Sequence, residues 1–202
     1  MIERSDITGL ILCGGAGSRF DGRDKPLEEF DGSPIVARVR ERLVPQVGHV
    51  VISCNRNFDA YARWGDPIVA DETPDRGPLE GILAGMNNAE TSYLFACPGD
   101  APFLPPGLVA LLTTASCRDD AEIAVPHDGT QRQHLFMLIR RSLAPALREY
   151  LSAGGRSVHG FVDVRRVAVV EAAFEADAFV NVNRPADLQM AAELKRRTQR
   201  NT

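Results

Sequence analysis

Several features that would place this chain in a specialised class of protein are absent from its sequence. No apolar run approaches the roughly 20 residues that a membrane-spanning helix needs, and residues 1–9 lack the apolar segment of a secretory signal peptide. There is no excess of basic residues either, since the net charge is −4 and the pI is near 5.6. Nucleic-acid-binding proteins usually carry a basic face. The sequence therefore predicts a cytoplasmic protein that binds neither a membrane nor nucleic acid.

Cysteine is scarce and widely spaced. The four cysteines are Cys13, Cys54, Cys97 and Cys117, and no two of them form a Cys-x-x-Cys pair. This spacing favours neither a disulfide framework nor a zinc knuckle. Because cysteine is usually buried in folded proteins, we expect four buried free thiols.

Short apolar runs alternate with longer segments of helical period, which is the pattern of βαβ units around a mostly parallel sheet. Linkers, repeats and low-complexity tracts are absent, so we expect a single domain covering residues 1–202. Strands are predicted at Gly9–Cys13, Val50–Cys54, Pro67–Ala70, Tyr93–Cys97, Glu122–Pro126, Leu135–Arg140, Val167–Val170 and Phe179–Val182. Helices are predicted at Ile35–Leu43, Leu79–Asn88, Pro106–Ala115, Leu143–Leu151 and Ala186–Arg197.

The segment LILCGGAGSRFDGRDKPL, residues 10–27, continues the first predicted strand into a glycine-rich loop and then a run of charges. It is not a Walker A motif, because Arg23 and Asp24 stand where Lys and Ser/Thr are required. It is not a dinucleotide-binding fingerprint, because Phe20 stands where the third glycine is required. Two familiar phosphate loops are thereby excluded.

The remaining interpretation is a phosphate-binding loop of another kind. Gly14, Gly15 and Gly17 allow close approach of the backbone to a ligand, and backbone N–H groups can wrap a triphosphate. Arg19 and Lys25 can neutralise its oxygens. The alternative is an ordinary βα turn with solvated charges.

Polar side chains follow three other predicted strands. Asn55 carries an amide that both donates and accepts, although an Asn at this point can equally be a turn former. Asp71 accepts hydrogen bonds only, and guanine presents adjacent N1–H and N2–H₂ donors. We therefore hypothesise that Asp71, with Asn55, reads guanine or else the ribose hydroxyls. Asp100 is either a hard oxygen ligand suited to Mg²⁺ or an Asx-turn residue.

Two more segments offer polar groups. Gly77 and Pro78 begin a predicted helix whose first N–H groups can meet an anion. Alternation within the predicted strand Phe179–Val182 and beyond it places Asn181 and Asn183 on one face.

These segments together resemble one family. LCGGAGSRFDGRDKPL is similar to the Leu-x-Gly-Gly-x-x-x-Arg-Met-Gly-x-x-Asp-Lys loop of the MobA-type molybdenum cofactor guanylyltransferases, with Phe20 in place of Met and Asp21 in place of Gly. VADETPDRGPLEGI is similar to that family's Asp-x-x-Pro-x-x-Gly-Pro-Leu-x-Gly stretch, and FVNVNRPADL to its Phe-x-Asn-x-Asn-Thr-Pro-Glu-Asp/Glu-Leu stretch. The resemblance extends from Ile7 to Leu188.

The resemblance implies an α/β fold of the nucleotidyltransferase type, with three α/β/α layers, a Rossmann-like arrangement and a mostly parallel mixed sheet. It implies transfer of GMP from GTP to molybdopterin or Mo-molybdopterin with release of pyrophosphate, and Mg²⁺ as cofactor. Other proteins of molybdenum cofactor biosynthesis and recipient molybdoenzymes are the implied partners. Two alternatives stay open: a relative that uses CTP or another small phosphate acceptor, and a non-catalytic GTP-binding assembly module.

The resemblance also implies roles for individual residues. The implied catalytic residues are Arg19, Lys25 and Asp100, with Asp100 as the metal ligand. The implied GTP-binding residues are Leu12, Cys13, Gly14, Gly15, Lys25, Asn55, Asp71 and Asp100. The implied molybdopterin-binding residues are Gly77, Pro78, Gly81, Asn181 and Asn183, and Arg156 is a weaker candidate for the same anionic substrate.

Overall fold

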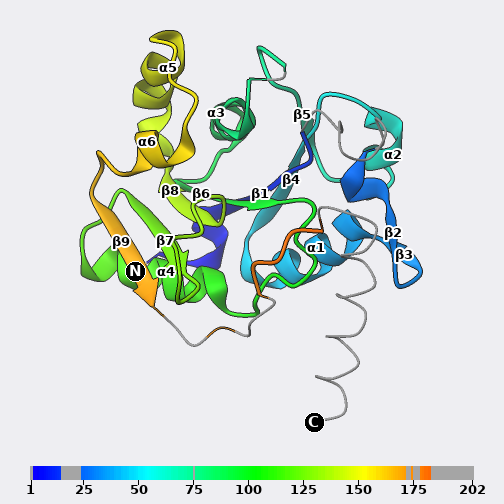
Figure 1. Cartoon of the computed structure of the whole chain (residues 1–202), viewed down its shortest axis with the longest axis horizontal. Coiled ribbons are helices and arrows are strands. Elements are labelled where there is room, and N and C mark those ends of the chain that lie inside the picture. Colours follow the sequence, from blue (N-terminus) through cyan, green and yellow to red (C-terminus); the bar gives the residue numbers. More distant parts are fainter. Residues whose placement is uncertain (1, 15–23, 75, 172–173, 175–177, 183–202) are drawn as a thin grey trace.

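A seven-stranded mixed sheet forms the centre of the computed structural model (Figure 1). The structure describes residues 2–14, 24–74, 76–171, 174 and 178–182. Within these residues the strand order is β5-β4-β1-β6-β8-β7-β9, and every neighbouring pair is parallel except those that β8 makes with β6 and β7. The strands are β1 (Ile7–Leu12), β4 (His49–Ser53), β5 (Ile68–Val69), β6 (Tyr93–Pro98), β7 (Ile123–His127), β8 (Met137–Arg140) and β9 (Val167–Glu171).

Helices cover both faces of this sheet, which gives the three-layer α/β/α arrangement that the sequence predicts (Figure 1). One face carries α1 (Ile35–Leu43) and α4 (Leu108–Arg118), and the other carries α3 (Pro78–Asn88), α5 (Ala144–Ser152) and α6 (Val158–Val162). The buried apolar residues accordingly form two clusters, one on each side of the sheet. The central strands β1 and β6 are buried on both faces, and their sequences are nearly continuous apolar runs for that reason.

Smaller elements lie at the margin of the sheet. Sequence reasoning did not predict the short helices α2 (Phe58–Ala62) and α6, nor the two-stranded hairpin of β2 (Glu29–Phe30) and β3 (Ser33–Pro34). Four 3₁₀ turns complete the described elements: η1 (Arg4–Asp6), η2 (Lys25–Leu27), η3 (Val44–Gln46) and η4 (Arg141–Leu143). No helix among the described residues is both long enough and apolar enough to cross a membrane.

The predicted strand at Phe179–Val182 is wrong, because these residues lie in a turn and irregular structure. Packing explains the apolar alternation instead. The ring of Phe179 lies edge-on to Phe136 and to Phe174, with both pairs of ring centroids 5.0 Å apart. The Val182 N–H donates a hydrogen bond to the carbonyl oxygen of Asp100 at 2.9 Å. The segment is therefore a strap held by aromatic contacts and this backbone bond.

Two other expectations need comment. Asn183 and the predicted helix Ala186–Arg197 lie outside the described residues, and the shared strand face predicted for Asn181 and Asn183 loses its basis. Three of the four thiols are buried as predicted, but Cys117 is exposed because it lies on the outer side of α4.

The order of the central strands determines where a ligand can bind. The chain passes from β1 through α1 to β4 on one side, and later from β5 through α3 to β6 on the other side of β1. Leu12, at the end of β1, is in register with Ser53 of β4 and Pro98 of β6. In open α/β sheets, ligands bind beyond the carboxyl ends of the strands at such a reversal of direction. The loops after β1, β4 and β6 therefore meet at the predicted site.

Candidate active site

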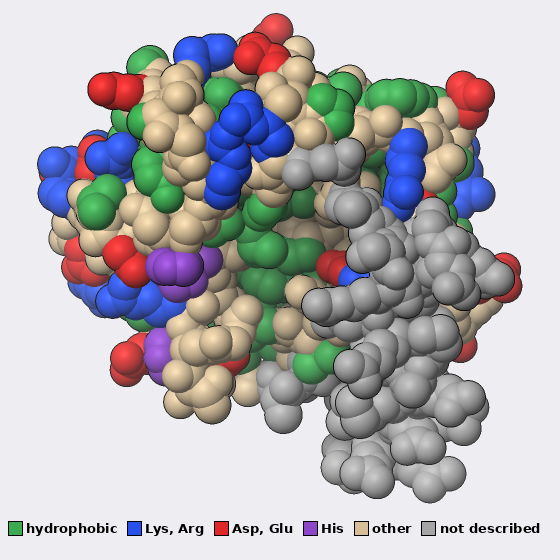
Figure 2. Space-filling view, turned by 45° about the horizontal axis from the view of Figure 1, so that its top comes forward, with side chains coloured by type: hydrophobic (Ala, Val, Ile, Leu, Met, Phe, Trp, Pro, Cys, Tyr) green, Lys and Arg blue, Asp and Glu red, His purple; other side chains and the backbone are tan. Residues whose placement is uncertain are grey.

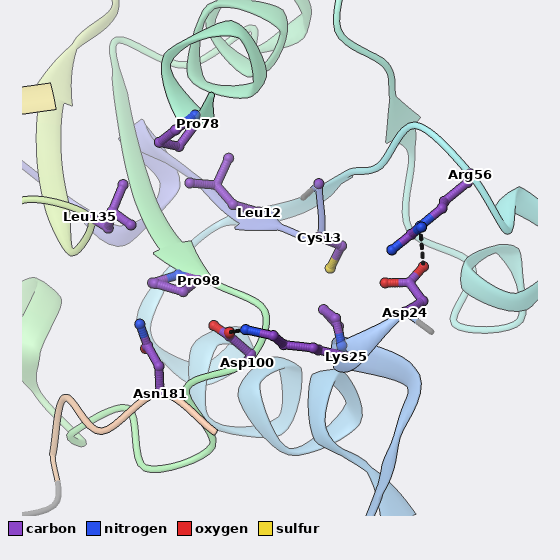
Figure 3. Close-up of a pocket in the computed structure, with 12 residues that line it drawn as sticks. Leu12, Cys13, Asp24, Lys25, Arg56, Pro78, Pro98, Asp100, Leu135 and Asn181 are labelled. Atoms are coloured by element: carbon purple, nitrogen blue, oxygen red, sulfur yellow. Dashed lines mark ion pairs between the residues drawn. The ribbon is translucent and has the colours of Figure 1, made fainter. Parts of the chain in front are cut away.

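A cavity of about 260 Å³ opens at this edge of the sheet, and its lining comes from seven separate parts of the chain (Figure 3). Figure 2 shows a hollow in this region of the surface, with a hydrophobic floor and charged side chains inside it. The cavity is lined by Leu12, Cys13, Gly14, Asp24, Lys25, Pro26, Arg56, Pro78, Pro98, Asp100, Leu135 and Asn181. Seven residues of the predicted site therefore line one cavity: Leu12, Cys13, Gly14, Lys25, Pro78, Asp100 and Asn181.

The side chains of Lys25 and Asp100 point toward each other on one side of the cavity (Figure 3). The Lys25 Nζ atom lies 3.6 Å from Asp100 Oδ2, and their side chains are 20% and 18% exposed. Burial raises the pKa of the Asp100 carboxyl above its ordinary value, while Lys25 acts in the opposite direction. A desolvated carboxylate of this kind is stabilised by a neighbouring cation. The pair therefore puts one positive and one negative group where a phosphate and its counterion can be bound.

The strap between residues 178 and 182 brings Asn181 to the same place. Val182 is fully buried and its backbone is bonded to that of Asp100. Asn181 consequently projects beside Pro98 and Asp100 into the cavity (Figure 3). The structure thus places Asn181 next to the predicted metal ligand, although not by means of a strand.

Asn55 and Asp71 bind each other. The Asn55 Nδ2 group donates to Asp71 Oδ2 at 2.7 Å, and the Asp71 backbone N–H donates to Asn55 Oδ1 at 2.9 Å. These two bonds join the loop after β4 to the loop after β5 and set the orientation of the Asn55 amide. Both residues lie just outside the cavity lining, and Asn55 is next to Gly14, where an added Cβ would be 3.5 Å from Asn55 Nδ2. They form one hydrogen-bonded unit beside the loop after β1.

The opposite wall of the cavity is apolar. Leu12, Pro78, Pro98 and Leu135 form it, from β1, the start of α3, the end of β6 and the segment before β8 (Figure 3). Gly77 precedes Pro78 with a φ of +97°, a conformation that residues with a side chain rarely adopt. Gly77 therefore allows the chain to turn into α3 so that Pro78 faces the cavity.

Gly81 lies one turn into α3 and packs directly on the strand ends. A Cβ at this position would lie 2.7 Å from Ser53 Oγ and 3.0 Å from Leu12 Cδ2. Ser53 is buried, so it has little room to move. Gly81 thus allows α3 to approach β1 and β4 closely.

We expect Gly81→Ala to destabilise the fold, although alanine is the better helix former. Overpacking in a dense region costs about 1 to 3 kcal/mol, which exceeds the gain of about 1 kcal/mol in helix propensity. Urea unfolding of the ligand-free protein measures the effect. An unchanged midpoint would mean that α3 can shift without cost, and any loss of activity would then arise from contact with substrate.

Asp24 is a buried residue of the cavity that sequence reasoning did not select. Its side chain is only 3% exposed, and it accepts a hydrogen bond from Asn57 Nδ2 at 2.9 Å. Arg56 Nε lies 3.8 Å from the same oxygen, Oδ2. The available signal was its position, because it directly precedes Lys25 in the loop motif.

Some predicted residues have other surroundings or lie outside the described part. Gly15, Arg19 and Asn183 are outside it. Arg156 directs its guanidinium to backbone carbonyls, donating to Leu151 O at 2.9 Å and also to Gly155 O. Its side chain therefore caps the end of α5 in this structure.

Burial disfavours the thiolate form of the cysteines near the cavity. Burial raises the pKa of Cys13 well above its ordinary value and that of Cys54 to about 11. Both therefore stay protonated at neutral pH, and a protonated thiol is neither a nucleophile nor a metal ligand. Cys13 contributes shape to the cavity, not chemistry.

Metal-ligating side chains are few near the cavity. Among the described residues, no three His, Cys, Asp or Glu side chains are grouped so that they could hold a metal ion. The carboxylate of Asp100 is a hard oxygen donor in a desolvated position. This donor set fits Mg²⁺, which binds through one or two carboxylates together with waters and substrate phosphates.

Known proteins with related sequences cover almost the whole chain. The molybdenum cofactor guanylyltransferase of Ralstonia nicotianae is 46% identical over 96% of this chain and 99% of its own length. The enzyme of the same name from Bordetella petrii is 41% identical over 94% of this chain and 98% of its own length.

Solved structures share the fold. Molybdopterin-guanine dinucleotide biosynthesis protein A from Archaeoglobus fulgidus superposes with a TM-score of 0.77 at 20% identity, over 94% of this chain and 99% of that one. A nucleotidyl transferase from Methanothermobacter thermautotrophicus gives a TM-score of 0.74 at 20% identity, over 95% and 98%. Residues 9–167 match the family model of the MobA-like NTP transferase domain, and the chain belongs to this family.

Proposed function

We propose that this protein transfers GMP from GTP to molybdopterin, forming molybdopterin guanine dinucleotide and releasing pyrophosphate. The observation that carries the proposal is the close similarity, over nearly the full chain, to curated molybdenum cofactor guanylyltransferases. The cavity beyond β1 and β6 supports it, because the lysine and the carboxylate to which we assign phosphate and metal binding lie there together. The further partners in this proposal are other proteins of cofactor biosynthesis and the molybdoenzymes that receive the product, and the proposed location is the cytoplasm.

The donor nucleotide occupies the side of the cavity formed by the loop after β1. Backbone groups of Leu12, Cys13, Gly14 and Gly15 approach the nucleotide, and Lys25 and Arg19 neutralise its phosphates. A charge-assisted hydrogen bond to phosphate contributes about 1.5 to 3 kcal/mol. Asn55 and Asp71, already bonded to each other, contact the base or the ribose. The donor thus lies across the ends of β1, β4 and β5.

Asp100 is the proposed ligand of a magnesium ion. When bound, the ion supplies positive charge that stabilises the phosphate oxygens during transfer. The desolvation that raises the pKa of the Asp100 carboxyl also favours a cation beside its ionised form. Lys25 holds that position in this structure, at 3.6 Å.

The acceptor occupies the other side of the cavity. Asn181 offers an amide to its polar groups, while Pro78 and the apolar wall cover its ring system. Gly77 and Gly81 contribute by shaping the start of α3, and Asn183 belongs to the same proposed subsite. The two substrates then meet beside Lys25 and Asp100.

The chemistry requires alignment and charge stabilisation. An oxygen of the acceptor's terminal phosphate attacks the α-phosphorus of GTP, and the bond to the β-phosphate breaks as pyrophosphate leaves. The attacking phosphate is already anionic, so no general base has to remove a proton. Lys25 and Arg19 balance the negative charge that develops on the leaving group.

A substrate panel tests the proposal. Purified protein with molybdopterin and Mg²⁺ should release pyrophosphate rapidly with GTP and at least tenfold more slowly with CTP or ATP, because each lacks the paired donors of guanine. Omission of molybdopterin provides the control. Rapid release with CTP would identify a cytidylyltransferase, and GTP binding without any release would identify a binding module.

A further inference from the structure

Asp24 is a buried carboxylate at the junction of two loops. It directly precedes Lys25 at the end of the phosphate loop, and only 3% of its side chain is exposed. A buried carboxylate is costly unless its oxygens are bonded to donors or cations. Its observed partners both come from the loop after β4, namely Asn57 and Arg56. The side chain therefore joins the β1 loop to the β4 loop.

The backbone of Asp24 begins the turn that carries Lys25. The Leu27 N–H donates to the Asp24 carbonyl oxygen at 2.9 Å, which closes the 3₁₀ turn η2. Pro26 is buried within the same turn and restricts its backbone. A fixed Asp24 therefore fixes the point from which the Lys25 side chain extends toward Asp100 (Figure 3).

The same loop continues to the nucleotide-reading residues. Asn55, which is bonded to Asp71, directly precedes Arg56 and Asn57. Asn57 has a left-handed backbone with a φ of 54°, which its short polar side chain tolerates. A chain of bonded groups thus runs from Asp71 through Asn55 and Asn57 to Asp24 and then to Lys25.

Tyr61 forms the floor beneath Asp24. It is fully buried, and its phenol makes no hydrogen bond of ordinary geometry to the described residues. Burial raises the pKa of Tyr61 far above its ordinary value, and the nearby Cys13 and Asp24 add to the shift. Tyr61 therefore stays neutral, and its phenol lies near the Asp24 carboxylate, whose other neighbours are the amide of Asn57 and the guanidinium of Arg56.

We propose that Asp24 is a positioning residue for Lys25, acting through its bonds to Asn57 and Arg56. The inference rests on the proposed role of Lys25 at the phosphates. In this proposal Asp24 acts through its side-chain partners and not by contact with the substrate. It holds the lysine at a fixed distance from the residues that bind the rest of the nucleotide. The phosphates and the base can therefore be bound at the same time.

A double-mutant cycle tests this proposal. Asp24→Ala should lower kcat/KM for GTP at least tenfold, and Asn57→Ala should lower it by a smaller factor, because Arg56 still faces the carboxylate. Asp24→Asn should fall between wild type and Asp24→Ala, since its carboxamide oxygen can still accept from Asn57. If Asp24 acts through Lys25, adding Asp24→Ala to Lys25→Ala should cause little further loss.

Controls separate positioning from loss of the fold. Asp66→Asn removes an arginine–carboxylate pair with Arg40 at the start of β5, at the opposite edge of the sheet. It should leave kcat/KM for GTP unchanged at a matched fraction of folded protein, measured by circular dichroism. The dissociation constant for GTP, measured by calorimetry, should increase in Asp24→Ala and stay unchanged in Asp66→Asn.

The outcomes distinguish the proposal from the role on which it rests. Losses that multiply in the double variant would mean that Asp24 acts independently of Lys25, and would overturn the proposal. Full activity of Asp24→Ala with a large loss in Lys25→Ala would overturn it as well, while leaving Lys25 at the phosphates. Full activity of Lys25→Ala would overturn both roles.

Discussion

Asp100→Asn is expected to lower the turnover of GTP by about 100-fold, the scale at which removal of one group that stabilises transition-state charge slows an enzyme. The substitution keeps the size of the side chain and removes its charge. The backbone bond from Val182 to the Asp100 carbonyl does not involve the side chain, so the strap that carries Asn181 should stay in place. The loss should therefore arise from charge and not from unfolding.

Metal titration supplies the decisive measurement for Asp100. A carboxamide is a weaker ligand for Mg²⁺ than a carboxylate, so the variant should need a higher Mg²⁺ concentration for half of its maximal rate. Asp119→Asn, which removes an exposed carboxylate paired with Arg118 at the end of α4, is the matched control and should behave as wild type. If Asp100→Asn needs no more Mg²⁺ than wild type, Asp100 is only a residue of the turn after β6.

The sequence predicts the layers of this fold well, because burial determines both the apolar pattern of the sequence and the packing of the layers. Val50–Cys54 and Tyr93–Cys97 are apolar runs that are buried on both faces, and the structure places β4 and β6 there within two residues. The helix Ile35–Leu43 is observed with the predicted bounds, since its apolar residues recur at helical spacing. In these elements, the residues that must be buried against the rest of the protein are the apolar ones, so the apolar pattern in the sequence predicts the element.

The same reasoning fails where apolar residues are buried without a regular backbone. Apolar and polar residues alternate in Phe179–Val182 as they do in a strand. The position of Phe179 is instead set by ring contacts with Phe174, a few residues earlier, and with Phe136, which is distant in sequence. The short helix α2 has the opposite problem, because five residues give too few turns for a helical period to be detected. Tertiary contacts decide both segments, and a local pattern does not contain them.

The candidate site divides in the same way. Strand ends predict the meeting of Lys25 and Asp100, because the order of parallel strands brings these loops to one edge. The mutual bonds of Asn55 and Asp71 and the burial of Asp24 depend on how side chains from different loops are oriented. Spacing along the chain gives no information on those orientations. From the sequence alone, Asp24 cannot be distinguished from the other charged residues of its loop.

The second large effect is expected in the choice of base. With wild-type protein, GTP should bind at least tenfold more tightly than ATP, because adenine would present an acceptor to the Asp71 carboxylate, and two acceptors that face each other without a proton between them cost about 1 to 3 kcal/mol or more. Asp71→Asn should reduce the GTP/ATP ratio of binding constants by about tenfold or more, by loss of the same contact.

The bond from Asn55 determines how the new amide is oriented. Asn55 Nδ2 donates to Asp71 Oδ2 in the wild type, so in Asp71→Asn the amide oxygen should take that position and accept the bond. The amide NH₂ group then points where Oδ1 was. A donor at that point repels the N1–H and N2–H₂ groups of guanine and suits the N1 acceptor of adenine. The ratio should fall through weaker GTP binding and stronger ATP binding together.

Competition binding of GTP, ITP, ATP and CTP to both proteins measures the effect, with ITP reporting on the N2–H₂ group alone. The matched variant is Asn55→Ala, which removes the orienting bond and should lessen discrimination less than Asp71→Asn does, because the carboxylate itself remains. An equal loss of affinity for all four nucleotides in Asp71→Asn would contradict base reading. Asp71 would then contact the ribose, which all four share, and guanine would be read by the backbone of residues 12–14 at the end of β1.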